Sequence, residues 1–229
     1  MPDRIQHRGL VMSADIGTLG CTGSICSSAH AATPGVHVGG FFGGNVAGLV
    51  ELGLAAGWGK LRPHVATGRN ALSLYGIDPG ELELADATSV FDVDSLAVLQ
   101  AKMSVLELGP RLRLHFVRQG RLAVYMGAGF EYIRLRNDYT TAGGAVRFDF
   151  HGFAVPLHGG LEVFVLERLS VGLRFDYIWS YYAAIVAKSP QQTTALPLGM
   201  LQTALEGRAD PQANLPHLWT AALGLRVTL

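Results

Sequence analysis

The sequence has few charged residues and no long apolar run. Asp, Glu, Lys and Arg make up 16% of its 229 residues, below the roughly 25% usual for soluble domains, and the formal net charge is zero. This balance gives no nucleic-acid-binding signature. No stretch of about 18 consecutive uncharged apolar residues occurs, which excludes a helical membrane protein.

Cysteine is also scarce. Cys21 and Cys26 are the only two, and they lie in a Gly/Ser/Thr-rich segment that we expect to be a loop. The two cysteines could form a small local disulfide or remain free thiols, and both alternatives stay open because spacing alone does not establish disulfide geometry. Two thiols without companion ligands at zinc-site spacing disfavour a metal site. We expect neither a metal nor a cofactor.

What the sequence does contain is alternation between bulky apolar and small or polar residues. In residues 217–229 one parity carries bulky side chains and the other carries small ones and Arg226; the bulky set is Trp219, Leu223, Leu225, Val227 and Leu229. Period two places the two sets on opposite faces of a strand. A bulky apolar face backed by a small polar face is typical of a transmembrane β-barrel.

The same alternation recurs along the chain. It predicts eight strands, at 9–19, 35–46, 49–59, 104–117, 121–135, 146–165, 170–182 and 217–229. We therefore expect an all-β fold, an eight-stranded antiparallel up-and-down transmembrane β-barrel, formed by residues 1–229 as a single domain. Phe148 and Phe150 lie on the wrong parity of the sixth strand, which predicts a bulge near Gly152 or a strand end that projects beyond the bilayer.

Short and long connections alternate between these strands. Short turns follow strands two, four and six, and longer connections follow strands one, three, five and seven, the longest from Leu61 to Asp94. Short periplasmic turns and long extracellular loops are typical of bacterial outer-membrane barrels, so we expect that location. Removing residues 1–31 as an export signal would leave seven strands, so we expect any such signal to lie outside this numbering.

Aromatic residues support this orientation. Five lie on the lipid-facing parity near the extracellular ends of their strands, as an interfacial girdle would; they are Trp58, Tyr132, Trp179, Tyr181 and Trp219.

The opposite parity carries charged residues of both signs in nearly equal number. They are Asp15, Glu51, Glu107, Arg111, Arg113, His115, Arg121, Glu131, His158, Glu162, Arg174, Asp176 and Arg226. Enclosed charges are costly unless paired, and an eight-stranded barrel is just wide enough for its own side chains. We therefore expect a lumen plugged by salt bridges, and a proton or ion relay along the fourth strand is the less favoured alternative.

At this point the chain resembles the OmpA-type family of small eight-stranded outer-membrane barrels. The resemblance covers nearly the whole chain and rests on the strand series and on residues 224–229, which are similar to the C-terminal signal of these proteins. The family usually ends in phenylalanine, which Leu229 replaces here. We expect outer-membrane lipid, lipopolysaccharide and, through the C-terminal strand, the barrel-assembly machinery as partners, with no nucleic acid and a monomeric state.

Several functions fit such a barrel. We favour a non-enzymatic structural or surface-interaction protein that acts through its extracellular loops. A narrow channel for small or apolar solutes, resembling the OmpW type, is the first alternative. A lipid A-modifying enzyme is a lower one, because His217 lies on the lipid face without a convincing serine and carboxylate. A soluble lipocalin-like barrel would place its charges outside.

Two loops have distinctive compositions. Residues 78–94 contain six acidic residues and no basic one. We expect a solvated loop, because the spacing matches no calcium loop, and recruitment of divalent cations that bridge lipopolysaccharide is the less favoured alternative. Residues 196–206 are unusually apolar, which suggests a short helix on the rim or over the mouth of the barrel.

Overall fold

Long antiparallel strands make up most of the structure, a computed structural model that describes residues 9–23, 26, 32–46, 48–63, 68, 70–75, 97–119, 121–190, 193–204 and 211–229. The ring strands are β1 (Gly9–Thr22), β3 (Gly35–Val46), β4 (Val50–Pro63), β5 (Val98–Gln119), β6 (Leu122–Gly129), β7 (Glu131–Thr141), β8 (Gly144–Leu166), β9 (Leu169–Lys188) and β11 (His217–Thr228). The shorter elements are β2 (Ala32–Thr33), β10 (Thr193–Pro197), the 3-10 helix η3 (Leu72–Tyr75), α2 (Leu198–Ala204) and α3 (Pro211–Asn214).

The ring closes between the first and last strands. β1 pairs with β11 from Val11 opposite Thr228 to Thr22 opposite His217, and it pairs with β3 on its other side. β6 and β7 pair with the same two neighbours, β5 and β8, and are separated only by Phe130, so together they form one ring strand. The prediction of an eight-stranded antiparallel barrel is therefore confirmed.

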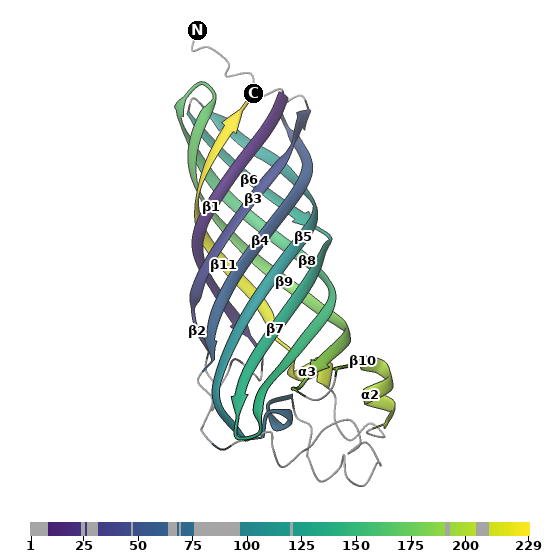
Figure 1. Cartoon of the computed structure of the whole chain (residues 1–229). Helices are drawn as coiled ribbons and strands as arrows, with labels where there is room; N and C mark the ends of the chain where they lie inside the picture. Colours follow the sequence, from purple (N-terminus) through teal and green to yellow (C-terminus); the bar gives the residue numbers. More distant parts are fainter. Residues whose placement is uncertain are drawn as a thin grey trace.

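The two ends of the barrel differ, as Figure 1 shows. Gly9 at the start of β1, the C-terminus and the short connections β3–β4, β5–β6 and β8–β9 lie at one end, and the helices lie at the other. We call these the periplasmic and extracellular ends, following the rule for such barrels. None of the described helices is long and apolar enough to cross a membrane.

The expectation of a long connection between the fifth and sixth strands is wrong. β7 and β8 form a continuous hairpin that turns at residues 142 and 143, where Thr141 Oγ1 donates a hydrogen bond to the Gly144 carbonyl. β5 and β9 are also longer than predicted, and all four strands extend at the extracellular end.

The polarity of the two faces explains this difference. Over most of each predicted strand bulky apolar side chains point outward, but toward the extracellular end they point inward, as Ile133 and Leu135 do, and charged side chains such as Arg136 and Arg147 point outward. Phe148 and Phe150, at 0% and 1% exposure, lie inside the barrel on the same inward parity as Ala154. The parity of β8 therefore never shifts, although a register shift against β9 does occur between His151 and Gly152, where a bulge was predicted.

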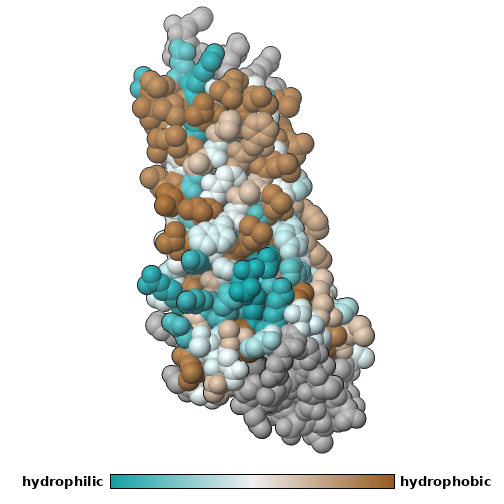
Figure 2. All heavy atoms as spheres, in the orientation of Figure 1, coloured by the Kyte–Doolittle hydropathy of each residue, from teal (hydrophilic) through white to brown (hydrophobic). Residues whose placement is uncertain are grey.

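The outer surface is apolar over the part of the barrel nearer the periplasmic end. Leu54 and Leu173 are 60% and 62% exposed, whereas Glu51 and Asp176 in the interior are fully buried. Figure 2 shows brown side chains over most of the barrel wall and a teal region near the extracellular end. An exterior of this kind suits lipid, and it rules out the soluble, lipocalin-like arrangement.

Candidate functional site in the barrel interior

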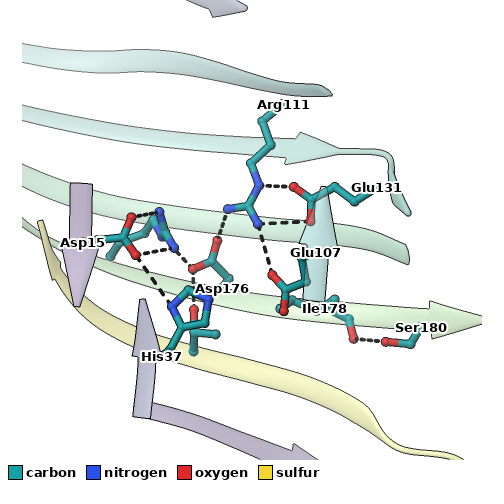
Figure 3. Close-up of polar contacts among 10 residues, drawn as sticks. Asp15, His37, Glu107, Arg111, Glu131, Asp176, Ile178 and Ser180 are labelled. Atoms are coloured by element: carbon teal, nitrogen blue, oxygen red, sulfur yellow. Dashed lines mark hydrogen bonds and ion pairs between the residues drawn. The ribbon is translucent and has the colours of Figure 1, made fainter. Parts of the chain in front are cut away.

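The first cluster of interior charges is centred on Asp176 of β9, shown in Figure 3. Arg174 Nε donates to Asp176 Oδ2 at 2.7 Å, and Arg111 Nη1 reaches across the lumen from β5 to Asp176 Oδ1, also at 2.7 Å. Arg174 also binds both carboxylate oxygens of Asp15 on β1, at 2.7 and 3.0 Å. Arg111 completes the cluster through Glu131 of β7.

A second cluster lies nearer the periplasmic end and is centred on Glu51 of β4. Arg226 of β11 pairs with Glu51, and its Nη1 donates to Glu162 Oε2 of β8 at 2.6 Å. Asn45 Nδ2 donates to Glu51 Oε1 at 2.9 Å, and His115 Nε2 lies 2.9 Å from the same oxygen. Because Arg226 joins strands that are not neighbours in the ring, this cluster also spans the lumen.

Arg113 is held differently. Its guanidinium lies over the Phe41 ring, 4.3 Å from the centroid, and 5.2 Å from the Tyr125 ring, while Nη1 is 3.8 Å from Glu51 Oε2. Such cation–π contacts supply part of the stabilisation that hydration would otherwise give a buried cation. His158 also packs against Tyr125, with ring centroids 6.2 Å apart.

The charge balance is less even than the sequence indicated. Arg121 is exposed at the turn before β6 and does not enter the lumen, so the expectation that it joins the interior charges is wrong. The described interior holds six buried carboxyl groups and four guanidinium groups, together with His37, His115 and His158. The described interior therefore has two more carboxyl groups than guanidinium groups.

Little space remains between the two clusters. A cavity of about 20 Å³ is lined by Asp15 and Arg174 from the first cluster and by Glu162 and Arg226 from the second. That volume holds about one water molecule. Small residues on the same face make this packing possible: a Cβ at Gly57 would lie 2.9 Å from His37 Nε2 and 3.1 Å from Glu107 Oε2.

Between the charged clusters and the extracellular end, the interior of the barrel becomes apolar. Ile133, Leu135 and Phe148 are fully buried there, in one cluster with residues of η3, α2 and the segment before β11. Helix η3 inserts Tyr75, which is 1% exposed and lies against the Phe150 ring at 5.0 Å between centroids. This layer occupies the extracellular mouth.

Polar groups fix η3 within that layer. The Tyr75 and Tyr139 hydroxyls are 2.6 Å apart, and Asn137 Nδ2 donates to the Tyr75 hydroxyl at 2.7 Å. Asn214 of α3 donates to the Tyr75 carbonyl at 3.1 Å. Burial strongly raises the pKa of the Tyr75 phenol, so the hydroxyl stays protonated.

Solved structures with the same arrangement are outer-membrane proteins. A major outer membrane protein from Thermus thermophilus matches with a TM-score of 0.56 and 13% identity over 95% of this chain and 98% of that one. This chain has the fold of the small outer-membrane β-barrels. Neisserial surface protein A and OprG of Pseudomonas aeruginosa each match with a TM-score of 0.50 and 13% identity, covering 96% and 99% of this chain and 97% and 100% of theirs.

No family model and no curated protein matches the sequence. The resemblance to OmpA-type barrels is thus supported at the level of fold, and together with the apolar exterior it supports the expected location in a bacterial outer membrane.

The expected aromatic girdle residues all lie on the outer wall of the barrel. Trp58, Tyr132, Trp179 and Tyr181 are 40–64% exposed, and Trp219 stacks on Phe175. Cross-strand register places Tyr132, Phe153 and Tyr181 in one row. Because β7 and β9 continue well past this row, the row does not lie at the extracellular ends of these two strands, whereas Trp219 does lie near the extracellular end of β11.

Cys21 and Cys26 are joined by a disulfide, with Cα atoms 5.8 Å apart. The acidic segment 78–94 lies outside the described residues. The apolar segment 196–206 contributes α2, whose Leu198 and Leu201 are buried in the apolar layer.

His217 does not form a hydrolytic dyad with the nearby serine. Its Nδ1 accepts a hydrogen bond from the backbone N–H of Ser180 at 3.2 Å, and its ring lies between those of Tyr177 and Trp179. The Ser180 hydroxyl is buried and donates instead to the Ile178 carbonyl. The described residues contain no group of three or more His, Cys, Asp and Glu arranged to hold a metal ion.

The interior also contains polar residues outside the predicted charge network. His37 and Thr220 lie on the inward parity of their strands, as the alternation predicts, and Thr220 Oγ1 donates to Asp176 Oδ2 at 2.6 Å. The burial of Tyr75 in the mouth has no periodic signal, because it depends on a loop that folds back into the barrel.

Proposed function

We propose that this protein is a non-enzymatic outer-membrane barrel with a closed lumen, which acts as a structural or surface-interaction protein through its extracellular end. The observation that carries the proposal is the ion-pair network that crosses the lumen from Arg111 to Asp176 and from Arg226 to Glu162 and Glu51. An apolar layer around Tyr75 lies on the extracellular side of this network.

The energetic cost of separating buried ion pairs favours a lumen that stays closed. Opening a path would separate buried partners, and removing one partner of a buried pair costs about 3–5 kcal/mol. Arg111 contacts three carboxyl groups at once, so its displacement would leave several of them unpaired. A hydrated ion would also have to cross the apolar layer, where desolvation is costly.

Conductance across planar bilayers tests the proposal. We expect the purified barrel to give no steady single-channel current. Arg111→Ala would alter the lumen, and the matched control Arg147→Ala removes a partly exposed arginine from the outer wall. Steady wild-type currents that Arg111→Ala changes and Arg147→Ala leaves intact would overturn the closed lumen and favour the narrow-channel alternative.

The non-enzymatic part of the proposal is tested separately. Mass spectra of lipid A from cells that express the protein and from cells that lack it should be identical. A mass difference that disappears in a His217→Ala variant would instead identify a lipid-modifying enzyme that uses this outer-wall histidine.

A further inference from the structure

A band of basic side chains lies on the outer wall just beyond the aromatic row of Tyr132, Phe153 and Tyr181. Toward the extracellular end of β7, the next residue on the outer wall is Arg134, opposite His151 of β8. Arg136, opposite Asp149, follows it. Successive outward positions on a strand are about 6.7 Å apart along its length, so the band begins one step past the girdle. It coincides with the teal region of Figure 2.

We define the basic band as Lys102 of β5, Arg134 and Arg136 of β7, Arg147 of β8 and Lys188 of β9. The strand register aligns its outermost row, because Lys102 lies opposite Asp138, Asp138 opposite Arg147, and Arg147 opposite Lys188. All five side chains are exposed or partly exposed.

Two carboxylates accompany these five cations. Asp149 binds Arg134 Nη2 at 2.8 Å and Arg136 Nε at 3.0 Å, and it is itself only 1% exposed. Asp138 pairs with Arg147. The band therefore keeps three positive charges in excess, and Asp149 holds two guanidinium groups side by side on the wall.

A groove runs through the outermost row. It has a volume of about 330 Å³ and is lined by Lys102, Asp138, Arg147 and Lys188, together with polar and apolar residues of the same strands and of the segment after β9. This volume is within the range of small-ligand pockets, which is roughly 300–1,000 Å³.

We infer that the basic band binds the phosphate groups of an outer-leaflet glycolipid of the lipid A type. Aromatic girdles lie at headgroup level, so the band, which begins one outward position beyond the aromatic row and ends three positions beyond it, spans the height of a phosphorylated headgroup. Guanidinium and ammonium groups form charge-assisted hydrogen bonds to phosphate oxygens, and a preassembled pair such as Arg134 and Arg136 loses little entropy on binding.

The shape of the band favours a membrane lipid over a free anion. Lys102, Arg147 and Lys188 meet at the groove, but Arg134 and Arg136 lie nearer the aromatic row, so the cations follow the barrel wall and do not surround a single point. A lipid that lies along this wall can place its acyl chains on the apolar surface below the girdle while its headgroup meets the band. This inference depends on the outer-membrane location and not on the closed lumen, so conductance and lipid binding can fail independently.

Lipid titration of the purified barrel in neutral detergent, followed by native mass spectrometry, tests the inference. The probes are lipid A with both phosphates, the same lipid with its phosphates removed, and inorganic phosphate as a competitor. The test variant is Arg147→Gln/Lys188→Gln. The control Arg121→Gln/Arg168→Gln removes two exposed arginines at the periplasmic turns.

We expect the wild type to bind the phosphorylated lipid about 10-fold more tightly than the stripped lipid, and the test variant to lose most of that preference. The control variant should bind as the wild type does. If the test variant fails to show heat-modifiable mobility on gels, Lys102→Gln serves in its place, because it leaves the Arg147–Asp138 pair intact.

Three results would overturn the inference. Equal affinity for phosphorylated and stripped lipid would show that the phosphates are not recognised. Equal losses in the test and control variants would show a nonspecific charge effect. Displacement of the lipid by millimolar inorganic phosphate would show a free-anion site and not a lipid site.

Discussion

Replacing Arg111 by methionine should destabilise the barrel far more than replacing an exposed arginine. The Arg111 side chain is 4% exposed and lies 2.7 Å from Asp176 Oδ1, 3.2 Å from Glu131 Oε2 and 3.7 Å from Glu107 Oε2. Arg111→Met keeps much of the side-chain volume but leaves buried carboxyl groups without their cation. The expected cost is about 3–5 kcal/mol.

Urea unfolding from lipid vesicles measures this cost, with Arg147→Met as the control. Arg147 is 42% exposed and its partner Asp138 is 38% exposed, so the control should lose no more than about 1 kcal/mol. Adding Glu131→Gln to Arg111→Met removes one unpaired charge, and the double variant should recover about 1 kcal/mol or more relative to additivity.

Comparable losses for Arg111→Met and Arg147→Met would refute the reasoning. So would strict additivity of Arg111→Met and Glu131→Gln, because it would mean that the two side chains do not interact in the folded barrel.

Three further predictions concern the outer layer, the mouth and the C-terminus. Tyr75→Phe should cost about 1–3 kcal/mol in thermal unfolding, because it leaves two buried polar partners unsatisfied, whereas Ser73→Ala at the exposed side of η3 should change little. Burial alone would raise the pKa of the Asp149 carboxyl, but hydrogen bonds from two arginines outweigh it and lower the pKa. Its contribution to stability should therefore be present at neutral pH and be lost as the pH falls below about 4, through the lowered pKa, and Asp149→Asn should reduce the stability difference between about pH 7 and pH 3 in urea unfolding. Leu229→Phe should increase the heat-modifiable fraction in isolated outer membranes, because Leu229 is 60% exposed just past the end of β11, where the OmpA-type barrels that the sequence resembles usually carry phenylalanine; an unchanged fraction would count against a role in assembly.

The sequence was most informative where strands cross the membrane. There, side chains such as Leu173 and Asp176 fall on opposite parities, and each parity has one environment, lipid or lumen. This regularity was enough to predict the strand number, the closure of the first strand on the last, and the interior position of Arg226 opposite an acidic environment.

The assignment of bulky apolar side chains to the outer face failed on the extracellular side of the aromatic row, for a physical reason. Outside the bilayer the barrel wall faces water, so the exterior becomes charged and the interior becomes apolar, as in a soluble barrel. Phe148 and Phe150 lie on the inward face of β8, as Ala154 does. What differs at their height is the surroundings of the barrel, which are water and not lipid. A sequence method that allows this inversion would have extended β7 and β8 to their observed hairpin.

Contacts between distant segments were beyond the reach of periodicity. The strands that carry Arg111 and Asp176 are not neighbours in the ring, and their pairing depends on side-chain length across the lumen. Tyr75 reaches Tyr139 only because a loop folds back into the mouth. Arg121 was misplaced because parity continues into a turn, where it no longer determines the side-chain direction.

A high-resolution experimental structure in detergent, with ordered water molecules located in the lumen, tests the closed barrel most directly. The account predicts isolated waters near the cavity between Arg174 and Arg226, and none connecting it to the extracellular side past Tyr75. A continuous file of water from the periplasmic turns to the extracellular mouth would contradict it.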